Sequence, residues 1–224
     1  METFQRFEKK YLLDKDQYDQ LMEKLKDHIV PDKFFKAQIN SIYYDTDDHQ
    51  MIRRSIEKPE YKEKLRVRSY EDADKDDRVF VELKKKLDGI VYKRRAQAKC
   101  DDVLSDIDHC KFDDEQVSRE IGYVLNCYHG LKPSIYIGCS RNSFVDKDDE
   151  DLRITFDSDL RYRMNDLSLR KSDKDRKLTD QIVMELKVKQ AMPIWLCRIL
   201  DEVKAYPQSY SKAGNAYLMQ AKGV

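Results

Sequence analysis

Residues 61–95 read YKEKLRVRSYEDADKDDRVFVELKKKLDGIVYKRR. Apolar side chains recur at every second position in three runs, which are separated by an acidic loop and by the turn Leu87-Asp88-Gly89. A repeat of two residues is the pattern of a β-strand, and turn residues between such runs favour hairpins. The stretch therefore predicts three neighbouring antiparallel strands.

Positive side chains gather on one face of these predicted strands. The first run places on one side Lys62, Lys64, Arg66 and Arg68. The second run places Phe80, Glu82, Lys84 and Lys86 on one side and Val79, Val81 and Leu83 on the other. Like charges that face each other across strands destabilise a sheet. A sheet that keeps such charges together is therefore expected to bind an anion.

Composition narrows the class of protein. Of 224 residues 38% are charged, and 43 basic residues balance 43 acidic ones. This balance argues against a general nucleic-acid binder, which carries a basic excess. The five scattered cysteines form no C-x-x-C pair, which is typical of a reduced, cytoplasmic protein. We expect no signal peptide, because charge begins at Glu2, and no apolar run reaches the roughly 20 residues of a membrane-spanning helix.

The remaining segments predict further strands and helices. Alternation predicts strands at residues 3–13, 37–45, 133–145, 152–164 and 181–189. Helices are expected at residues 14–28 and 114–129, from residue 193 until Pro207 ends that helix, and at residues 209–222. Asp14 and Pro193 suit helix starts. Because neither a repeat nor a linker is evident, we expect one domain over residues 1–224.

Two arrangements fit strands that have one charged face. In the first, which the pattern alone favours, that face is solvated and the apolar face packs on helices. In the second, an α+β fold closes eight antiparallel strands into a β-barrel tunnel with a polar, basic lumen, flanked by helices. Frequent arginine at mid-strand favours the tunnel, because a guanidinium group binds phosphate in a fork. Enclosure also strengthens a cation–phosphate contact at 4 Å from about 1 kcal/mol in water to several times that value.

The chain resembles a known family in eight short motifs, which occur in the family's order. They are residues 6–11 (RFEKKY), 41–46 (SIYYDT), 64–68 (KLRVR), 81–84 (VELK), 141–144 (RNSF), 152–157 (LRITFD), 184–187 (MELK) and 210–212 (YSK). The resemblance extends over residues 4–218 and is to the catalytic domain of the vacuolar transporter chaperone (VTC) polyphosphate polymerases. These polymerases belong to the triphosphate tunnel metalloenzymes, so the resemblance implies the eight-stranded tunnel. The superfamily begins with Glu-x-Glu-x-Lys; Arg6 in place of the first Glu favours the polymerase branch over the hydrolytic one.

The resemblance implies roles for particular residues. The catalytic cations would be Arg66, Arg68, Lys84, Arg141 and Arg153. Phosphate would be bound by Lys10, Lys93, Ser211 and Lys212, and Mn²⁺ or Mg²⁺ would be held by Glu185 and Glu8. The residues alone leave other interpretations open. For the cations these are a solvated face for Arg66 and Arg68 and pairing of Arg141 and Arg153 with Asp157 or Asp159. Glu185 could form a salt bridge to Lys187 or to an arginine of the lumen, and Glu8 could be the charge partner of a tunnel lysine. Tyr43, Tyr44 and Tyr92 could serve packing.

The expected activity is metal-dependent phosphoryl transfer from ATP to phosphate or to a growing polyphosphate chain. Such transfer needs mainly positioning and charge stabilisation, which suits a chain with many cations and no evident nucleophile dyad. Two alternatives stay open: a tunnel triphosphatase that hydrolyses tripolyphosphate or a nucleoside triphosphate, and a non-catalytic module that binds polyphosphate or inositol phosphates. The expected partners are ATP, phosphate and polyphosphate, without nucleic acid. The resemblance leaves room for a separate membrane partner.

Overall fold

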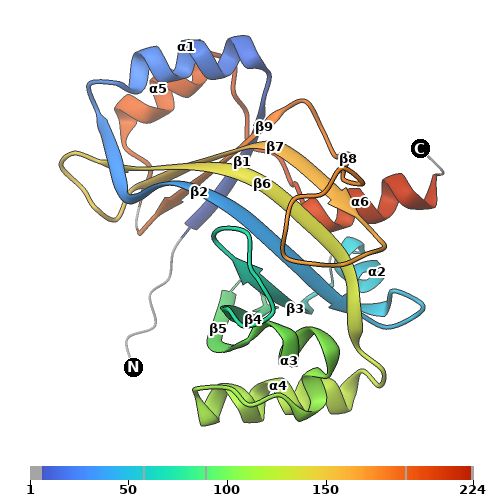
Figure 1. The fold of residues 1–224 in the computed structure, drawn as a ribbon. Coiled ribbons are helices and arrows are strands. Elements are labelled where there is room, and N and C mark those ends of the chain that lie inside the picture. The colour runs from blue at the N-terminus through green and yellow to red at the C-terminus, as the bar shows by residue number, and fades with distance from the viewer. Residues whose placement is uncertain (1–6, 58, 89, 190, 223–224) are drawn as a thin grey trace. The chain divides into compact units, whose positions relative to one another are not determined.

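The computed structural model describes residues 7–57, 59–88, 90–189 and 191–222 (Figure 1). Residues 3–6 of the first expected strand, including Arg6, and the turn residue Gly89 lie outside these ranges. The strands are β1 (Phe7–Leu13), β2 (Ile29–Asp45), β3 (Tyr61–Ser69), β4 (Arg78–Leu87), β5 (Ile90–Lys99), β6 (Lys132–Asp146), β7 (Arg153–Arg163), β8 (Arg176–Lys177) and β9 (Ile182–Val188). The helices are α1 (Lys15–Leu25), α2 (Gln50–Ile56), α3 (Cys100–Ser105), α4 (Glu115–Cys127), α5 (Ile194–Glu202) and α6 (Lys212–Ala221), with a 3₁₀ turn at Ile107–His109.

The strands form an antiparallel sheet, so the fold is α+β as expected. Their hydrogen-bonded order is β1-β9-β7-β6-β2-β3-β4-β5, and the short β8 pairs with β7. Within the described part of the chain this order is open, because no hydrogen-bonded ladder joins β1 to β5. The closed barrel is therefore not confirmed. No helix in the described ranges is long and apolar enough to cross a membrane.

The chain divides into two compact units, each made of separate segments. The first unit comprises Met1–Ala37, Cys139–Leu160 and Lys177–Tyr210, and the second comprises Gln38–Gly138, Arg161–Arg176 and Ser211–Val224. Each unit has its own apolar core.

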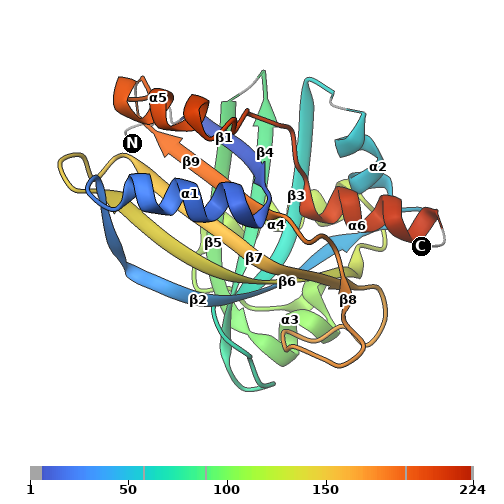
Figure 2. The ribbon, with the colours of Figure 1, turned by 90° about the horizontal axis from the view of Figure 1, so that it is seen from above.

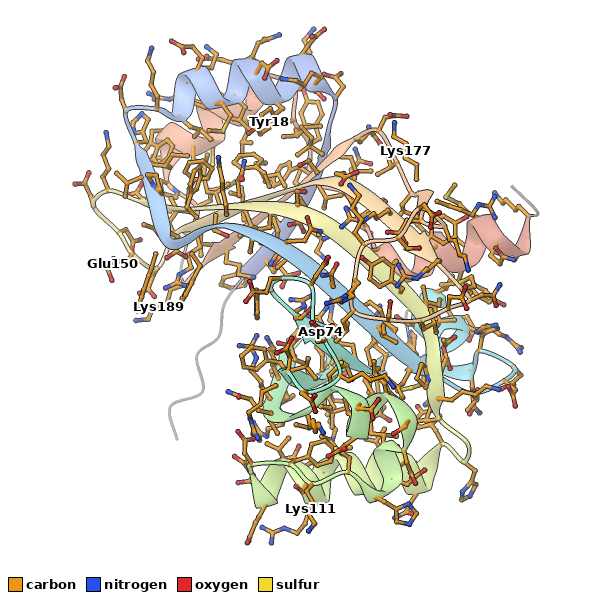
Figure 3. The ribbon with its side chains drawn as sticks, viewed as in Figure 1. Tyr18, Asp74, Lys111, Glu150, Lys177 and Lys189 are labelled. Atoms are coloured by element: carbon orange, nitrogen blue, oxygen red, sulfur yellow. The ribbon has the colours of Figure 1, made fainter. Side chains whose placement is uncertain are left out.

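In the first unit, α1 and α5 lie side by side over the strands (Figures 1 and 2). Leu21 of α1 and Leu196 of α5 are fully buried in the core that they share with the strands. Tyr18 reaches from α1 toward the sheet, and its ring meets Phe156 edge-on at 5.1 Å (Figure 3). Asp14 starts α1 as predicted, because its carboxylate accepts a hydrogen bond from the backbone N–H of residue 17 at 2.7 Å.

In the second unit, β3, β4 and β5 run side by side as the predicted hairpins (Figure 2). The predicted apolar face is confirmed, because Val79, Val81 and Leu83 are all completely buried. They pack in one core with the apolar stripe of α4, which includes Ile121 and Val124. The predicted helix at residues 114–129 is thus confirmed as α4, and Asp114 caps it by accepting a hydrogen bond from the Val117 N–H.

Several element boundaries differ from the prediction. Helix α1 ends at Leu25, not at residue 28, and α5 ends at Glu202, before Pro207 is reached. Strand β2 begins at Ile29, not at residue 37, so Pro31 lies inside a strand. Residues 30–38 are mostly exposed or half-buried and lack the apolar alternation on which the prediction depended. Helix α6 begins at Lys212, not at residue 209, because the Ser211 hydroxyl accepts a hydrogen bond from the Gly214 N–H at 3.2 Å and so caps the helix.

Candidate phosphate-binding site

The register of β3, β4 and β5 brings positive side chains together in the second unit. Lys84 of β4 lies directly opposite Lys64 of β3 on one side and Lys93 of β5 on the other. Residues opposite each other in antiparallel strands have Cβ atoms about 4.5–5.5 Å apart. One strand face therefore holds a set that we call the cationic patch, made of Lys64, Arg66, Arg68, Lys84, Lys93 and Arg95.

A buried carboxylate, that of Glu82, lies at the centre of the cationic patch. Its side chain is 1% exposed, and its oxygens lie 2.7 Å from Arg66 Nη2, 2.6 Å from Lys93 Nζ and 2.5 Å from Arg95 Nη2. Burial by itself raises the pKa of Glu82, but the charges of Arg66, Arg68 and Lys93 outweigh burial and hold that pKa far below its usual value. The carboxylate is therefore ionised, and it orients the cations without neutralising the patch.

Tyr43 of β2 belongs to the same face, although its residue type suggested a packing role. It lies opposite Arg66 in the β2–β3 pair, and Arg66 Nη1 donates a hydrogen bond to the Tyr43 hydroxyl at 2.9 Å. Burial raises the pKa of this phenol, but the charges of Arg66, Arg68 and Lys64 outweigh it and lower the pKa to about 7. Tyr43 can therefore exchange a proton near neutral pH, beside the guanidinium groups.

The start of α6 adds a hydroxyl to this face. Lys64 Nζ donates a hydrogen bond to Ser211 Oγ at 3.1 Å, so the structure brings the predicted phosphate ligand Ser211 to the cationic patch. A Cβ at position 214 would lie 3.1 Å from the same oxygen, so Gly214 leaves room for this cap. Lys212 is the first residue of α6, where backbone N–H groups favour anions.

The first unit contains a second cluster of predicted site residues. Glu185 of β9 lies opposite Lys10 of β1, and Glu8 lies opposite Lys187. Glu185 Oε1 is 2.6 Å from Lys187 Nζ, its Oε2 is 3.9 Å from Lys10 Nζ, and that ammonium is 3.5 Å from Glu8 Oε1. Burial raises the pKa of Glu185, but the charges of Lys187, Lys10 and Arg141 outweigh it, so this pKa lies well below its usual value. Glu185 is therefore an ionised oxygen donor that already has a salt bridge.

The two arginines predicted in the first unit differ in their surroundings. Arg141 makes two parallel bonds to Asp157, from Nε at 2.6 Å and from Nη2 at 2.7 Å, and Asp157 is 1% exposed. Arg153 is exposed and lies 3.8 Å from Asp32. Of the pairings left open by the sequence, the one between Arg141 and Asp157 is therefore present.

The donor set for a divalent metal consists of carboxylates. Among residues 7–57, 59–88, 90–189 and 191–222, no group of three or more His, Cys, Asp or Glu side chains could hold a metal. Mg²⁺ sites commonly use one or two carboxylates and complete their shell with water and substrate phosphate oxygens. Glu8 and Glu185, both within 4 Å of the Lys10 ammonium, fit such a partial site.

Sequence reasoning placed Lys64 and Glu82 on the second-unit face but gave them no site role. It gave Tyr43 a packing role and gave Arg95 none. The signal that could have found Glu82 is its position as the one acid among Phe80, Lys84 and Lys86 on the same strand face. An isolated acid facing cations on both neighbouring strands is expected to pair with them. The register that makes these strands meet was not available from the pattern alone.

The family model for the VTC domain matches residues 5–219, which confirms the resemblance. A candidate adenylate cyclase from Bacillus halodurans shares 14% identity and a TM-score of 0.57, over 91% of this chain and 92% of that chain. The likeness at 0.57 shows a common fold.

Two further solved structures are similar over most of their length. The protein PH1819 from Pyrococcus horikoshii shares 14% identity and a TM-score of 0.49, over 96% of this chain and 99% of that chain. A candidate adenylate cyclase from Vibrio parahaemolyticus shares 10% identity and a TM-score of 0.46, over 95% and 97%. A search among curated proteins gives no match.

Proposed function

Since the chain belongs to the VTC domain family, we propose that it is a polyphosphate polymerase, which transfers a phosphoryl group from ATP to phosphate or polyphosphate with the help of a divalent metal. The observation that carries this proposal is the cationic patch around Glu82. One buried carboxylate among six cations leaves an excess of positive charge on a single strand face. Such an excess of positive charge is expected where a polyanion binds, because it would destabilise a strand face that has no ligand.

The cationic patch is suited to hold a triphosphate in a fixed position. Arg66, Arg68, Lys84 and Lys93 would contact its oxygens, and Ser211 and Lys212 would add donors from α6. Because Glu82 already fixes Arg66 at 2.7 Å, little reorganisation is needed when phosphate binds. Transfer to an ionised phosphate acceptor needs no general base, so positioning and charge stabilisation are the main contributions of the protein.

The first unit would supply the ligands of the metal. Glu185 and Glu8 would hold Mn²⁺ or Mg²⁺ through their oxygens, and the metal, when bound, would neutralise charge on phosphate. Lys10 lies between these carboxylates and would compensate their charge. Arg141, which Asp157 holds in a fork, and the exposed Arg153 are proposed to stabilise the transferring group. The closed tunnel expected from the family remains a prediction.

The test is to incubate the purified chain with ATP and Mn²⁺ and to resolve the products on a gel. Polyphosphate longer than the donor's own phosphate tail supports the proposal. Free phosphate as the only product would favour the triphosphatase instead. Tight binding of tripolyphosphate without turnover under either metal would favour the non-catalytic binding module.

The patch itself is tested by replacing one of its members. Arg66→Ala removes a charged donor that touches the proposed phosphate position, and loss of one such donor is expected to lower turnover by about 10²- to 10³-fold. Arg119→Ala is the matched control, because Arg119 is an exposed arginine of α4. Equal turnover in the two variants would contradict the role given to the cationic patch.

A further inference from the structure

A solvent-open cavity of about 230 Å³ lies beside the cationic patch, within the second unit. It is lined by Phe80, Arg95, Ala96, Gln97, Asp113 and Asp114. Pockets that enclose a whole drug-sized ligand have volumes of roughly 300–1,000 Å³. This smaller cavity therefore suits one planar group and not a complete nucleotide.

Arg95 is shared between the cavity and the cationic patch. Its Nε and Nη2 donate to Glu82 Oε1 at 2.9 and 2.5 Å, while its Cζ lies 4.4 Å from the centre of the Phe80 ring. The Tyr70 hydroxyl, 2.5 Å from Nη2, holds the guanidinium from a third direction. A guanidinium plane held in this way, with an aromatic ring beneath it, is a surface on which a nucleobase can stack.

Polar groups line the rest of the cavity. Gln97 and Asp113 are joined through their backbones, because the Gln97 N–H donates to Asp113 Oδ1 at 2.6 Å and the Asp113 N–H donates to the Gln97 carbonyl at 3.2 Å. These bonds fix the segment before α4 against β5. Arg78 Nε donates to Gln97 Oε1 at 3.3 Å, and this oxygen can accept a second bond from the N6 amino group of adenine while the amide NH₂ donates to N7. The carboxylate of Asp113 lies 3.5 Å from Arg78 Nη2, and that of Asp114 caps α4. Their remaining lone pairs would accept from the same amino group and would repel a carbonyl oxygen at that position.

The strand register separates this cavity from the residues that would bind phosphate by a distance that a nucleotide can span. Phe80 lies opposite Gln97, the next row on this face holds Glu82 and Arg95, and the row after that holds Lys84 and Lys93. Four residues of strand separate Phe80 from Lys84, which is roughly 13 Å at the usual rise. The ribose and the first phosphates of an extended nucleotide can span a gap of this order.

We propose that this cavity binds the adenine ring of the nucleoside triphosphate whose phosphates contact the cationic patch. The inference rests on the proposed function and adds to it a source of nucleotide selectivity. Arg95 stacks on the base, Gln97 reads its N6 and N7 edge, and the two aspartates disfavour uracil and guanine, which carry a carbonyl oxygen where adenine carries its amino group. Tripolyphosphate, which has no base, uses the cationic patch alone.

The experiment compares binding of ATP, UTP and tripolyphosphate to the purified chain by calorimetry, at one pH and one salt concentration. ATP is expected to bind about tenfold more tightly than UTP. Gln97→Ala is expected to reduce this ratio to less than threefold and to leave the tripolyphosphate affinity within twofold of its original value. Gln116→Ala, which changes an exposed glutamine of α4, is the matched control and is expected to leave all three affinities unchanged.

A second variant keeps the proposal testable if Gln97→Ala does not fold. Asp113→Asn keeps an acceptor for the Gln97 N–H but removes the charge that repels a carbonyl oxygen, so UTP is expected to gain affinity relative to ATP. Equal affinities of ATP and UTP in the original chain, with tripolyphosphate still bound, would overturn the base site and leave the proposed function intact. No binding of tripolyphosphate would instead overturn the proposed function, which makes the two failures distinguishable.

Discussion

Arg66 Nη2 lies 2.7 Å from Oε2 of Glu82, a carboxylate that is 1% exposed. The Nε atom of the same arginine also donates to Oε2, at 2.8 Å, so the guanidinium binds through two of its nitrogens. Its third nitrogen, Nη1, donates to Tyr43. Glu82 and Tyr43 therefore fix the direction of Arg66 from two sides, and each supports a separate prediction.

Glu82→Gln is expected to destabilise the second unit. The change leaves Arg66, Lys93 and Arg95 close together without their shared negative charge, and breaking a buried ion pair costs about 3–5 kcal/mol. The free energy of unfolding, measured with a chemical denaturant, is expected to fall by about 3 kcal/mol. Glu120→Gln is the control, because Glu120 pairs with Arg94 and Lys85 at a more exposed site and should cost at most about 1 kcal/mol. Similar losses of unfolding free energy in both variants would show that the buried Glu82 stabilises the fold no more than the more exposed Glu120 does.

Tyr43 is expected to make anion binding depend on pH. Its pKa is lowered to about 7, so in the folded chain it becomes negative as pH rises through 7, whereas in the unfolded chain it stays neutral until about pH 10. The negative phenolate competes with phosphate for Arg66, so tripolyphosphate should bind less tightly to the original chain than to Tyr43→Phe at pH 8, and about equally at pH 6. Calorimetry at both pH values measures this difference. The same ratio of the two tripolyphosphate affinities at pH 6 and at pH 8 would contradict this prediction.

The same ionisation should contribute to stability in a defined pH window. Because the folded-state pKa is depressed, the contribution is present in full above the unfolded value near 10 and is lost as pH falls through about 7. Between these values the unfolded chain binds a proton that the native chain lacks, so stability of the original chain should rise with pH relative to Tyr43→Phe. The free energies of unfolding of both chains, measured with a denaturant at pH 7 and pH 9, test this prediction. A difference between the two chains that stays the same at both pH values would contradict it.

Arg141 and Asp157 form a buried pair that should show strong coupling. Arg141→Ala leaves the Asp157 carboxylate buried without its fork, so unfolding free energy should fall by about 3–5 kcal/mol. The double variant Arg141→Met/Asp157→Leu replaces the pair by apolar groups of similar volume and should recover much of that loss. Denaturant unfolding of the original chain and the two variants measures this recovery. A double variant that is no more stable than Arg141→Ala would contradict the coupling.

Glu185→Gln separates metal binding from anion binding. The variant is expected to abolish turnover and to weaken Mn²⁺ binding, because it removes one of the two proposed carboxylate ligands. The affinity for tripolyphosphate should stay within a few-fold, since the cationic patch is unchanged. Calorimetry with Mn²⁺ alone and with tripolyphosphate alone provides both readings. Equal loss of the two affinities would argue against the metal role of Glu185.

Much of the local structure could be predicted because it depends on neighbouring residues. The alternation around Val79, Val81 and Leu83 predicted the strand and its buried face, Asp14 predicted the start of α1, and an apolar stripe predicted α4. Each of these signals lies within a few residues of the element it specifies. Strand β2 was partly missed for the same reason, since residues 30–38 carry no apolar period.

The site was less predictable because it depends on register. The cations of β3 were recognised as one face, but only the pairing of Arg66 with Glu82 and of Glu82 with Arg95 shows that a carboxylate lies at their centre. A shift of one residue would turn these side chains to the other face. The choice of Asp157 over Asp159 as the partner of Arg141 likewise depends on three-dimensional geometry.

Polyphosphate synthesis on the cationic patch is measured by following the terminal phosphate of ATP. With Mn²⁺ and ATP labelled at its γ-phosphate, we expect label to enter polyphosphate chains in the original protein and in Arg119→Ala, and we expect Arg66→Ala to lose this product. Label found only in free phosphate, or chain synthesis that is unchanged in Arg66→Ala, would contradict this prediction.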